Sequence, residues 1–329
     1  PILLLWLASP LLAWWVSRPL AHAPARLSAA QSRFLRLASR KTWAYFETCV
    51  GPEDNWLPPD NFQESPAVAL AHRTSPTNMG LALLANLSAY DFGYLPAAQL
   101  VARTRRALDA MQKLERHRGH FLNWYDTQTL QPLLPVYVST VDSGNLAGHL
   151  LTLRPGLAAL PDQPILAARW LEGMEDTLIA VLDAAPPRAS ASLLHFQTAL
   201  ETALASRPDT LAGARTLLGH LSAFAAQILG VVDEKSMSEP ADWARALDRQ
   251  CRELLEDLDA LVPAAAAPGP AGMPTLRELA AQGNAAARSR MEEIALLALE
   301  AGEMARMDYD FLYDDVRHLL AIGYHVGER

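Results

Sequence analysis

The chain has 329 residues, of which 50% are hydrophobic and 19% are charged. This composition is sufficient for one large core or two moderate ones, and it excludes disorder as the global state. Lys and Arg total 28 against 36 Asp and Glu, which gives a formal net charge of −8. Because binding to a phosphate backbone depends on clustered positive charge, we expect no nucleic acid partner.

The chain starts with an apolar stretch. Residues 1–16 (PILLLWLASPLLAWWV) carry no charged side chain, and every charged residue from there to Glu47 is basic. A spanning helix needs about 20 apolar residues, so we interpret 1–18 as the end of a transmembrane helix in a piece of a longer protein. By the positive-inside bias, the residues after this helix lie in the cytoplasm. A buried helix of a soluble domain stays open as an alternative, because Pro10 weakens the length test.

Apolar spacing and breakers predict the next elements. Apolar residues at three- and four-residue steps predict a helix over 27–50, and the prolines after it predict an irregular loop over 55–64. Hydroxyl residues around Pro76 are typical of a helix start. A further helix is predicted over 97–115.

The second part of the chain changes character twice. Aromatic and β-branched residues over 119–138 favour short strands or an ordered loop. Asp142 and its neighbours then lead into an apolar helix that we expect to end at Leu153. From 155 to 304, helical stretches rich in Ala, Leu and Arg alternate with prolines, and PAAAAPGPAG at 263–272 is typical of a linker or long loop.

Cysteine and histidine spacing argues against a metal site. Cys49 and Cys251 show no ligand motif, so we expect two small buried apolar residues on helices, in a reducing compartment. His120 and His149 are predicted as hydrogen-bonded core residues rather than metal ligands. No GxSxG motif, Walker loop or dinucleotide fingerprint is present, which disfavours esterases, NTPases and dehydrogenases.

Four short stretches combine acids, amides, Arg and aromatic residues. Acids and amides bind hydroxyl groups, and a pyranose face packs on an aromatic ring, so the mixture favours carbohydrate. Helix capping by Asp142, Ser143 and Asn145, a structural ion pair of Arg73, and core positions for Trp43 and Trp56 remain alternatives. The four stretches contain Asn55, Trp56, Asp60, Asn61 and Glu64; Arg73, Thr74, Asn78 and Gly80; His120, Asn123, Trp124, Tyr125 and Asp126; and Asp142, Ser143, Asn145 and His149.

Glycoside chemistry needs a pair of carboxyl groups, about 5 Å apart at a retaining site and about 6.5–9.5 Å apart at an inverting one. No pair stands out in the sequence, so the catalytic residues are not assigned. The acids considered are Asp60, Glu64, Asp126, Asp142, Asp308, Asp310, Asp314 and Asp315.

Several motifs together resemble the central region of bacterial cyclic β-1,2-glucan synthases. They include RTSPTN at 73–78, HFLNWYD at 120–126 and VDSGNLAGHL at 141–150, with RKTWAYFETCV and NWLPPDNFQE before them and YDFLYDDVRHLLAIGYHV near the end. The similarity covers about 39–153 and 307–329.

The resemblance implies an all-α fold, a partial (α/α)6 toroid of helical hairpins with an added helical region, preceded by the end of a transmembrane helix. The implied organisation is 1–18, the end of the transmembrane helix; 19–154, the first part of the glycoamylase-like module; 155–306, a helical region; and 307–329, the start of the second part of that module.

The resemblance also implies the activity. Such synthases are inner-membrane proteins in which an upstream glycosyltransferase module uses UDP-glucose, and a central module closes linear β-1,2-glucan into a ring by retaining transglycosylation. The implied partners are linear β-1,2-glucan, adjoining modules of the same polypeptide and the membrane, with the soluble part on the cytoplasmic side. No cofactor or metal is implied for this segment.

The catalytic acids are expected downstream of the last motif, so we expect this chain alone to be inactive and to contribute part of a glucan-binding wall. A β-glucan hydrolase of the same fold and a noncatalytic glucan-binding or scaffolding module are the alternatives. The substrate-binding candidates are Arg73, Asn78, Trp124, Asp126, Asp142 and Asn145.

Overall fold

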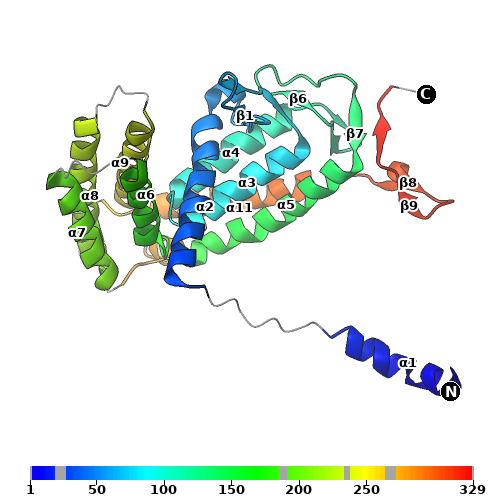
Figure 1. The fold of residues 1–329 in the computed structure, drawn as a ribbon, viewed down its shortest axis with the longest axis horizontal. Helices are drawn as coiled ribbons and strands as arrows, with labels where there is room; N and C mark the ends of the chain where they lie inside the picture. Colours follow the sequence, from blue (N-terminus) through cyan, green and yellow to red (C-terminus); the bar gives the residue numbers. More distant parts are fainter. Residues whose placement is uncertain (1, 19–26, 185–190, 233–237, 264–271, 328–329) are drawn as a thin grey trace. The chain divides into compact units, whose positions relative to one another are not determined.

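A computed structural model shows a mainly helical chain with short strands (Figure 1), and the predicted all-α class is confirmed. It divides into two compact units, Pro1–Arg36 and Leu37–Arg329. The structure describes residues 2–18, 27–184, 191–232, 238–263 and 272–327. The predicted loop 263–272 therefore lies, apart from its two ends, outside the described residues.

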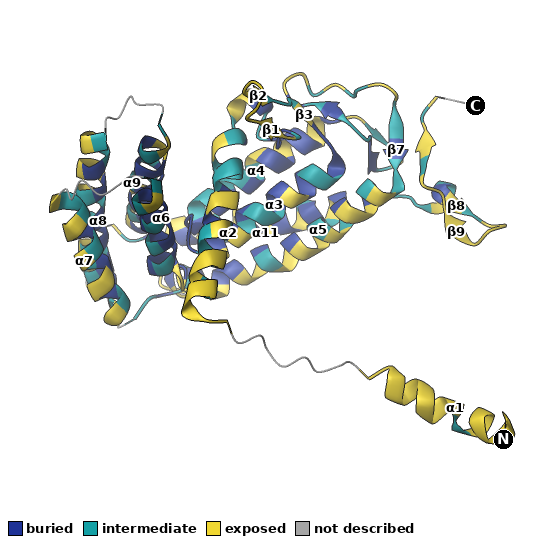
Figure 2. Cartoon of the chain, in the orientation of Figure 1, coloured by how far each residue is buried: buried dark blue, intermediate teal, exposed yellow. Residues whose placement is uncertain are grey.

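The first unit contains an apolar helix that buries none of its residues. Helix α1 (Ile2–Val16) has 15 residues, and its large side chains are exposed, among them Trp6 and Trp15 (Figure 2). The helix predicted within 1–18 is confirmed, while its place in a membrane stays a prediction. Helix α2 (Ala29–Cys49) begins in this unit and continues into the second, in agreement with the helix predicted over 27–50.

Eight of the described helices of the second unit form two groups of four. In the first group each helix packs against two neighbours, α3 on α4 and α5, and α11 on α4 and α5. In the second group α6 and α8 both pack against α7 and α9. The bounds are α3 (Pro76–Asp91), α4 (Ala97–Lys113), α5 (Thr140–Ala159), α6 (Trp170–Ala184), α7 (Ala191–Ala205), α8 (Leu211–Val232), α9 (Glu239–Leu261), α10 (Leu276–Ala281) and α11 (Ala285–Met304).

The second group accounts for most of the region predicted as 155–306, whereas α11, from the same region, belongs with α3, α4 and α5. By length and composition α8 is the one described helix that could cross a membrane. It packs against α7 and α9 through a buried stripe that includes Leu218, Leu221 and Ala225, while most of its residues are not buried.

Helix starts follow the sequence signals, with one exception. Ser75 caps α3 by accepting a hydrogen bond from the Asn78 backbone N (3.3 Å), with Pro76 in the first turn, as predicted. Helix α5 is capped by Ser139, whose hydroxyl accepts from the backbone N of Asp142 (3.2 Å). The capping alternative for Asp142, Ser143 and Asn145 is therefore wrong.

Helix α5 also extends beyond its predicted end at Leu153, through Pro155 to Ala159. A proline removes one backbone donor, but the buried stripe continues past it. Leu146, Leu150, Leu153 and Leu157 are all fully buried against the neighbouring helices. Burial of this stripe outweighs the local cost of the proline.

Short antiparallel strand pairs connect the helices, and the strands expected within 119–138 are confirmed. Backbone hydrogen bonds extend one pair: Val326 N donates to Val136 O and Thr140 N to Ile322 O, both at 3.0 Å. The pairs are β1 (Phe62–Gln63) with β2 (Ala69–Leu70), β3 (Arg73–Thr74) with β6 (Tyr125–Asp126), β4 (Arg116–His117) with β5 (His120–Phe121), β7 (Tyr137–Ser139) with β10 (Gly323–His325), and β8 (Tyr313–Asp314) with β9 (Leu319–Leu320). The single-turn helices are η1 (Pro52–Asp54), η2 (Leu160–Asp162) and η3 (Asp310–Leu312).

A buried polar network joins α2 to α6 and α9. Arg40 is fully buried; its Nε donates to Thr177 Oγ1 (2.8 Å) and its Nη2 to Glu47 Oε2 (3.0 Å). Arg249 Nη2 lies 2.7 Å from the other oxygen of Glu47. Thr177 in turn donates to Gln250 Oε1 (2.7 Å). Helices α6 and α9 therefore supply partners for the charges that α2 buries.

Two glycines allow the turn after α3 to touch α6. Gly93 has φ +78°, and a Cβ there would lie 2.2 Å from the carbonyl oxygen of Arg169. A Cβ on Gly173 would lie 2.3 Å from the carbonyl oxygen of Gly93, which also accepts from Gln250 Nε2 (2.8 Å). Only glycine fits at either position.

Both cysteines were predicted to be buried on helices. Cys251 is fully buried in α9, as predicted, whereas Cys49 is only half-buried in α2. Both cysteines are unpaired.

Two adjacent leucines of α5 test the packing of the first helix group. Leu150→Ala should lower the free energy of unfolding by about 2–5 kcal/mol, because Leu150 is fully buried. Leu151 is 58% exposed, so Leu151→Ala should stay within about 0.5 kcal/mol of the wild type. Urea unfolding measures both, and equal losses would contradict this arrangement.

Glu47→Gln should lower the free energy of unfolding by about 3–5 kcal/mol, because Arg40 would stay buried without a full counter-charge. Burial alone would raise the pKa of Glu47, but the charges of Arg40 and Arg249 outweigh it and hold the pKa below its ordinary 4.5. This stabilisation is therefore present above pH 4.5 and is lost on acidification. Urea unfolding at pH 7 and pH 3 should show the difference between the two proteins shrinking; the exposed Glu256→Gln is the control.

Candidate functional site

The loop before β3 and the starts of α3 and α5 meet on one side of the first helix group. The β3–β6 pairing sets Arg73 opposite Asp126. The packing of α3 on α5 brings the first turns of the two helices together, since Thr77 donates to Asp142 Oδ1 (2.6 Å). Stretches that are far apart in the sequence thus share one surface.

Asp60 holds the first half of this surface together. Arg73 Nε and Nη2 donate to Asp60 Oδ2 (3.2 and 3.0 Å), and Asn78 Nδ2 donates to Asp60 Oδ1 (3.2 Å). The Arg73 guanidinium carbon also lies 5.0 Å from the centroid of the Trp124 ring, within cation–π range. Arg73 remains 51% exposed, so one face of the cluster is open to solvent.

Asp142 holds the second half. Its Oδ1 accepts from Thr77, whose hydroxyl oxygen accepts from Asn145 Nδ2 (3.1 Å). In the amide orientation that satisfies both partners, Asn123 donates to Asp142 Oδ2 (3.3 Å) and accepts from Trp124 Nε1 (3.1 Å). Trp124 therefore links the two halves.

We call this surface the polar patch. It brings together five of the six predicted binding residues, Arg73, Asn78, Trp124, Asp142 and Asn145, with three further residues, Asp60, Thr77 and Asn123. Asp60 and Asn123 belong to the polar stretches that the sequence indicated. Thr77 was missed as a site residue, because a hydroxyl in the first turn of a helix is usually explained by capping.

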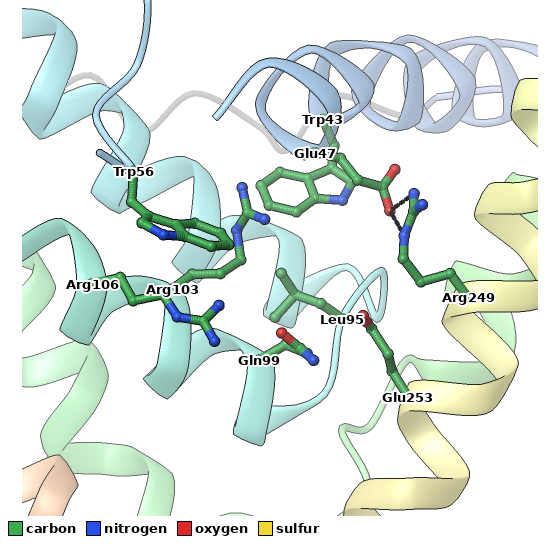
Figure 3. Close-up of a pocket in the computed structure, with 9 residues that line it drawn as sticks. All are labelled: Trp43, Glu47, Trp56, Leu95, Gln99, Arg103, Arg106, Arg249 and Glu253. Atoms are coloured by element: carbon green, nitrogen blue, oxygen red, sulfur yellow. Dashed lines mark hydrogen bonds and ion pairs between the residues drawn. The ribbon is translucent and has the colours of Figure 1, made fainter. Parts of the chain in front are cut away.

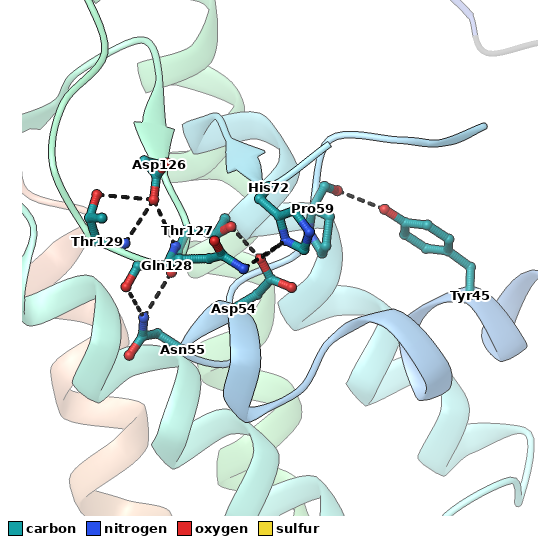
Figure 4. Close-up of polar contacts among 9 residues, drawn as sticks. All are labelled: Tyr45, Asp54, Asn55, Pro59, His72, Asp126, Thr127, Gln128 and Thr129. Atoms are coloured by element: carbon teal, nitrogen blue, oxygen red, sulfur yellow. Dashed lines mark hydrogen bonds and ion pairs between the residues drawn. The ribbon is translucent and has the colours of Figure 1, made fainter. Parts of the chain in front are cut away.

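Asp126, the sixth predicted residue, serves a turn. Its Oδ1 accepts from the backbone N of Gln128 (3.0 Å) and from the backbone N and hydroxyl of Thr129 (2.7 and 3.0 Å), as Figure 4 shows. These hydrogen bonds hold the pKa of Asp126 below its ordinary value, and the bond from the Thr129 backbone N has the largest effect. Its backbone, paired with Arg73, orients the polar patch, while its side chain fixes the turn.

Figure 4 also shows how this turn is tied to the loop after η1. Asn55 Nδ2 donates to the carbonyl oxygens of Thr127 (2.8 Å) and Gln128 (3.0 Å). Asp54 Oδ1 accepts from the Thr127 hydroxyl and lies 2.8 Å from His72 Nδ1. Asn55 thus has a structural role.

His120 is a buried residue whose side chain is hydrogen-bonded, as predicted. Its Nδ1 lies 2.8 Å from Ser143 Oγ and its Nε2 lies 2.6 Å from the carbonyl oxygen of Asp308; burial lowers its pKa. His149 does not agree with that prediction: it is half-buried against Gly80, and its buried Nδ1 has no hydrogen-bond partner within the described ranges. No group of three or more potential metal ligands occurs among the described residues.

A pocket of about 320 Å³ opens elsewhere in the second unit, between α2, α4, α9 and the loop after η1 (Figure 3). Sequence reasoning did not find it, because its residues lie on helices far apart in the chain. Its walls contain none of the six predicted residues; they are formed by Trp43, Glu47, Trp56, Leu95, Gln99, Arg103, Arg106, Arg249 and Glu253. Trp43 is buried, as the core alternative expected, and Trp56 is half-buried.

The sequence of the chain is similar to that of one known enzyme. No family model matches the chain. Over 349 aligned positions, covering 99% of the chain, it is 33% identical to the cyclic beta-(1,2)-glucan synthase NdvB of Rhizobium meliloti (strain 1021). The chain is related to a segment of a cyclic β-1,2-glucan synthase. It spans 11% of that relative, and the resemblance inferred from the motifs is confirmed.

A solved structure, a putative glucoamylase from Bacteroides fragilis NCTC 9343, matches at 18% identity with a TM-score of 0.34. The match covers 42% of this chain and 34% of the other. A similarity of this size does not establish the (α/α)6 toroid, which stays a prediction.

Thr77→Val tests whether the polar patch is a connected network. The valine keeps the shape but removes the hydroxyl between Asp142 and Asn145, so the free energy of unfolding should fall by about 0.5–1.5 kcal/mol. Thr152, exposed on α5 with a bond only to the Gly148 carbonyl, is the matched control. A loss no larger than that of Thr152→Val in urea unfolding would contradict the network.

Proposed function

We propose that this segment contributes to the part of a cyclic β-1,2-glucan synthase that binds linear β-1,2-glucan and closes it into a ring by retaining transglycosylation. The polar patch carries the proposal, because it presents two carboxylates, three amides, a guanidinium and an indole on one partly exposed surface. This set of groups matches a ligand with many hydroxyls.

The patch is pre-organised for such a ligand. Asp60 fixes Arg73 and Asn78, and Thr77 fixes Asp142, so the side chains keep their orientation before a sugar arrives. Pre-organisation lowers the entropic cost of binding. The remaining lone pairs of these oxygens, and the exposed donors of Arg73, are the groups we assign to glucan hydroxyls.

Retaining transglycosylation needs two carboxyl groups about 5–5.5 Å apart, one acting as nucleophile and the other as acid and base. Asp60 and Asp142 each accept hydrogen bonds from neighbouring side chains, so we assign them to binding. We propose that the reacting pair lies in another part of the full-length protein and that this segment alone is inactive.

Membrane attachment through α1 belongs to the same proposal. The helix is apolar, contains no charged residue and buries none of its side chains. We propose that it is the end of a transmembrane helix in the bacterial inner membrane, with the remainder on the cytoplasmic side. Adjoining modules would include the one that uses UDP-glucose; this segment is proposed to need no cofactor.

The decisive experiment incubates the full-length protein with linear β-1,2-glucan and weighs the products by mass spectrometry. A ring weighs one water less than the open chain of the same length. Rings support the proposal, shorter open chains identify a hydrolase, and unchanged glucan that still binds identifies a noncatalytic binding module.

Trp124→Ala should weaken binding of linear β-1,2-glucan to the full-length protein about tenfold, equivalent to about 1.4 kcal/mol. The reason is the loss of the ring on which the Arg73 guanidinium packs and of the bond from Nε1 to Asn123, which together hold the two halves of the patch in place. Isothermal titration measures the affinity, and Phe34→Ala, an exposed aromatic of α2, is the control. Unchanged affinity for Trp124→Ala would remove the patch from the glucan-binding surface.

A further inference from the structure

The pocket in Figure 3 has a chemistry that differs from that of the polar patch. Its volume of about 320 Å³ is at the lower end of the range for small-molecule sites. It is lined by two indoles, one leucine and six polar or charged side chains. A small and strongly polar ligand fits this wall better than an apolar one.

Positive charge is in excess in this pocket. Three arginines line it, against Glu47 and Glu253. Glu47 is already neutralised, because it pairs with Arg249 (2.7 Å) and with the buried Arg40 (3.0 Å). The other two arginines outnumber the one remaining carboxyl group, that of Glu253, so the pocket carries net positive charge in a chain whose net charge is −8.

These two arginines flank one indole and retain unused donors. The guanidinium carbons of Arg106 and Arg103 lie 4.4 and 5.8 Å from the centroid of the Trp56 ring. Arg103 donates through Nε to Asn86 Oδ1 (3.0 Å) and through Nη2 to the Phe46 carbonyl (2.7 Å), which leaves Nη1. The Arg106 side chain makes no hydrogen bond or ion pair with any other described residue, so its whole guanidinium remains available.

Two more polar side chains lack partners. Neither the Gln99 nor the Glu253 side chain makes a hydrogen bond to another residue that the structure describes, although both line the pocket. Figure 3 shows them on the side of the pocket opposite Trp43. An oxygen of a ligand can accept from the Gln99 amide, which is partly withdrawn from water, whereas the Glu253 carboxyl can donate to such an oxygen only in its protonated form.

We propose that this pocket binds a small ligand that carries an oxyanion, a phosphate or carboxylate group, held by Arg103 and Arg106 with Gln99 as a further donor. The guanidinium fork matches the oxygens of such groups. A neutral sugar would leave the two positive charges uncompensated, and the guanidiniums already lie over the Trp56 ring, where a sugar would stack. The proposal does not depend on glucan binding at the polar patch.

Isothermal titration of the full chain with inorganic phosphate, glucose 6-phosphate, glucuronate and glucose tests the proposal. We expect binding of the anions and none of glucose; the preference between glucose 6-phosphate and glucuronate identifies the anionic group. Arg106→Ala should weaken anion binding about tenfold or more. Arg288→Ala, an exposed arginine of α11 outside the pocket, should not change it.

Three results would overturn the proposal: no anion binds to the wild-type chain, glucose binds as well as its phosphate, or Arg106→Ala and Arg288→Ala have the same effect. Arg106 is exposed and its side chain makes no hydrogen bond to another described residue, so its variant should fold. Circular dichroism checks each variant.

A pH series tests the role of Glu253. Burial raises the pKa of this carboxyl to about 7; it faces Arg249 and Arg252 of its own helix, Glu47 of α2 and Arg103 of α4. The ionised form repels an anion, so sulfate, whose charge is constant in this range, should bind more weakly at pH 8 than at pH 6. Glu253→Gln should abolish the difference. An equal pH dependence in the variant would exclude Glu253 from the site.

Discussion

Burial of the Arg40 guanidinium is the interaction on which the arrangement of α2, α6 and α9 depends. A charge removed from water is tolerated only where partners satisfy it. Glu47 supplies the counter-charge and Thr177 an acceptor, while Arg249 and Gln250 hold those two groups in place. The three helices are therefore set by directional polar contacts in addition to apolar packing, and the hydrogen bond from Gln250 to the Gly93 carbonyl extends them to the turn after α3.

The same network shapes the pocket in Figure 3, whereas the polar patch has a separate origin. Glu47 and Arg249 belong to both the network and the pocket wall. The patch instead follows from the packing of α3 on α5 and from the β3–β6 pairing, which bring Thr77 to Asp142 and Arg73 to Trp124. The molecule thus offers two polar surfaces of different charge, and a change at one should leave the chemistry of the other intact.

Local signals predicted much of the fold. The hydroxyl and proline around Ser75 fixed the start of α3, and apolar spacing found α2 and α4, because these signals act over one or two turns. The predicted end of α5 was wrong, because local rules treat Pro155 as a helix breaker. Burial of Leu153 and Leu157 against neighbouring helices favours continuation of the helix past this proline. The residue types in the motifs predicted most of the polar patch. The pocket forms only where α2, α4 and α9 pack together, and no local sequence pattern predicts that packing.

The β7–β10 pairing couples remote parts of the chain mechanically. Gly323 lies opposite Ser139, the residue that caps α5, and a side chain on Gly323 would collide with Tyr137 and the Val138 carbonyl. The backbone of Thr140, the first residue of α5, donates to Ile322. A displacement of the strand at Ile322–His325 is therefore passed to the first turn of α5, which carries Asp142. Strain applied near residue 322 would change the geometry of a surface whose residues all come before residue 150.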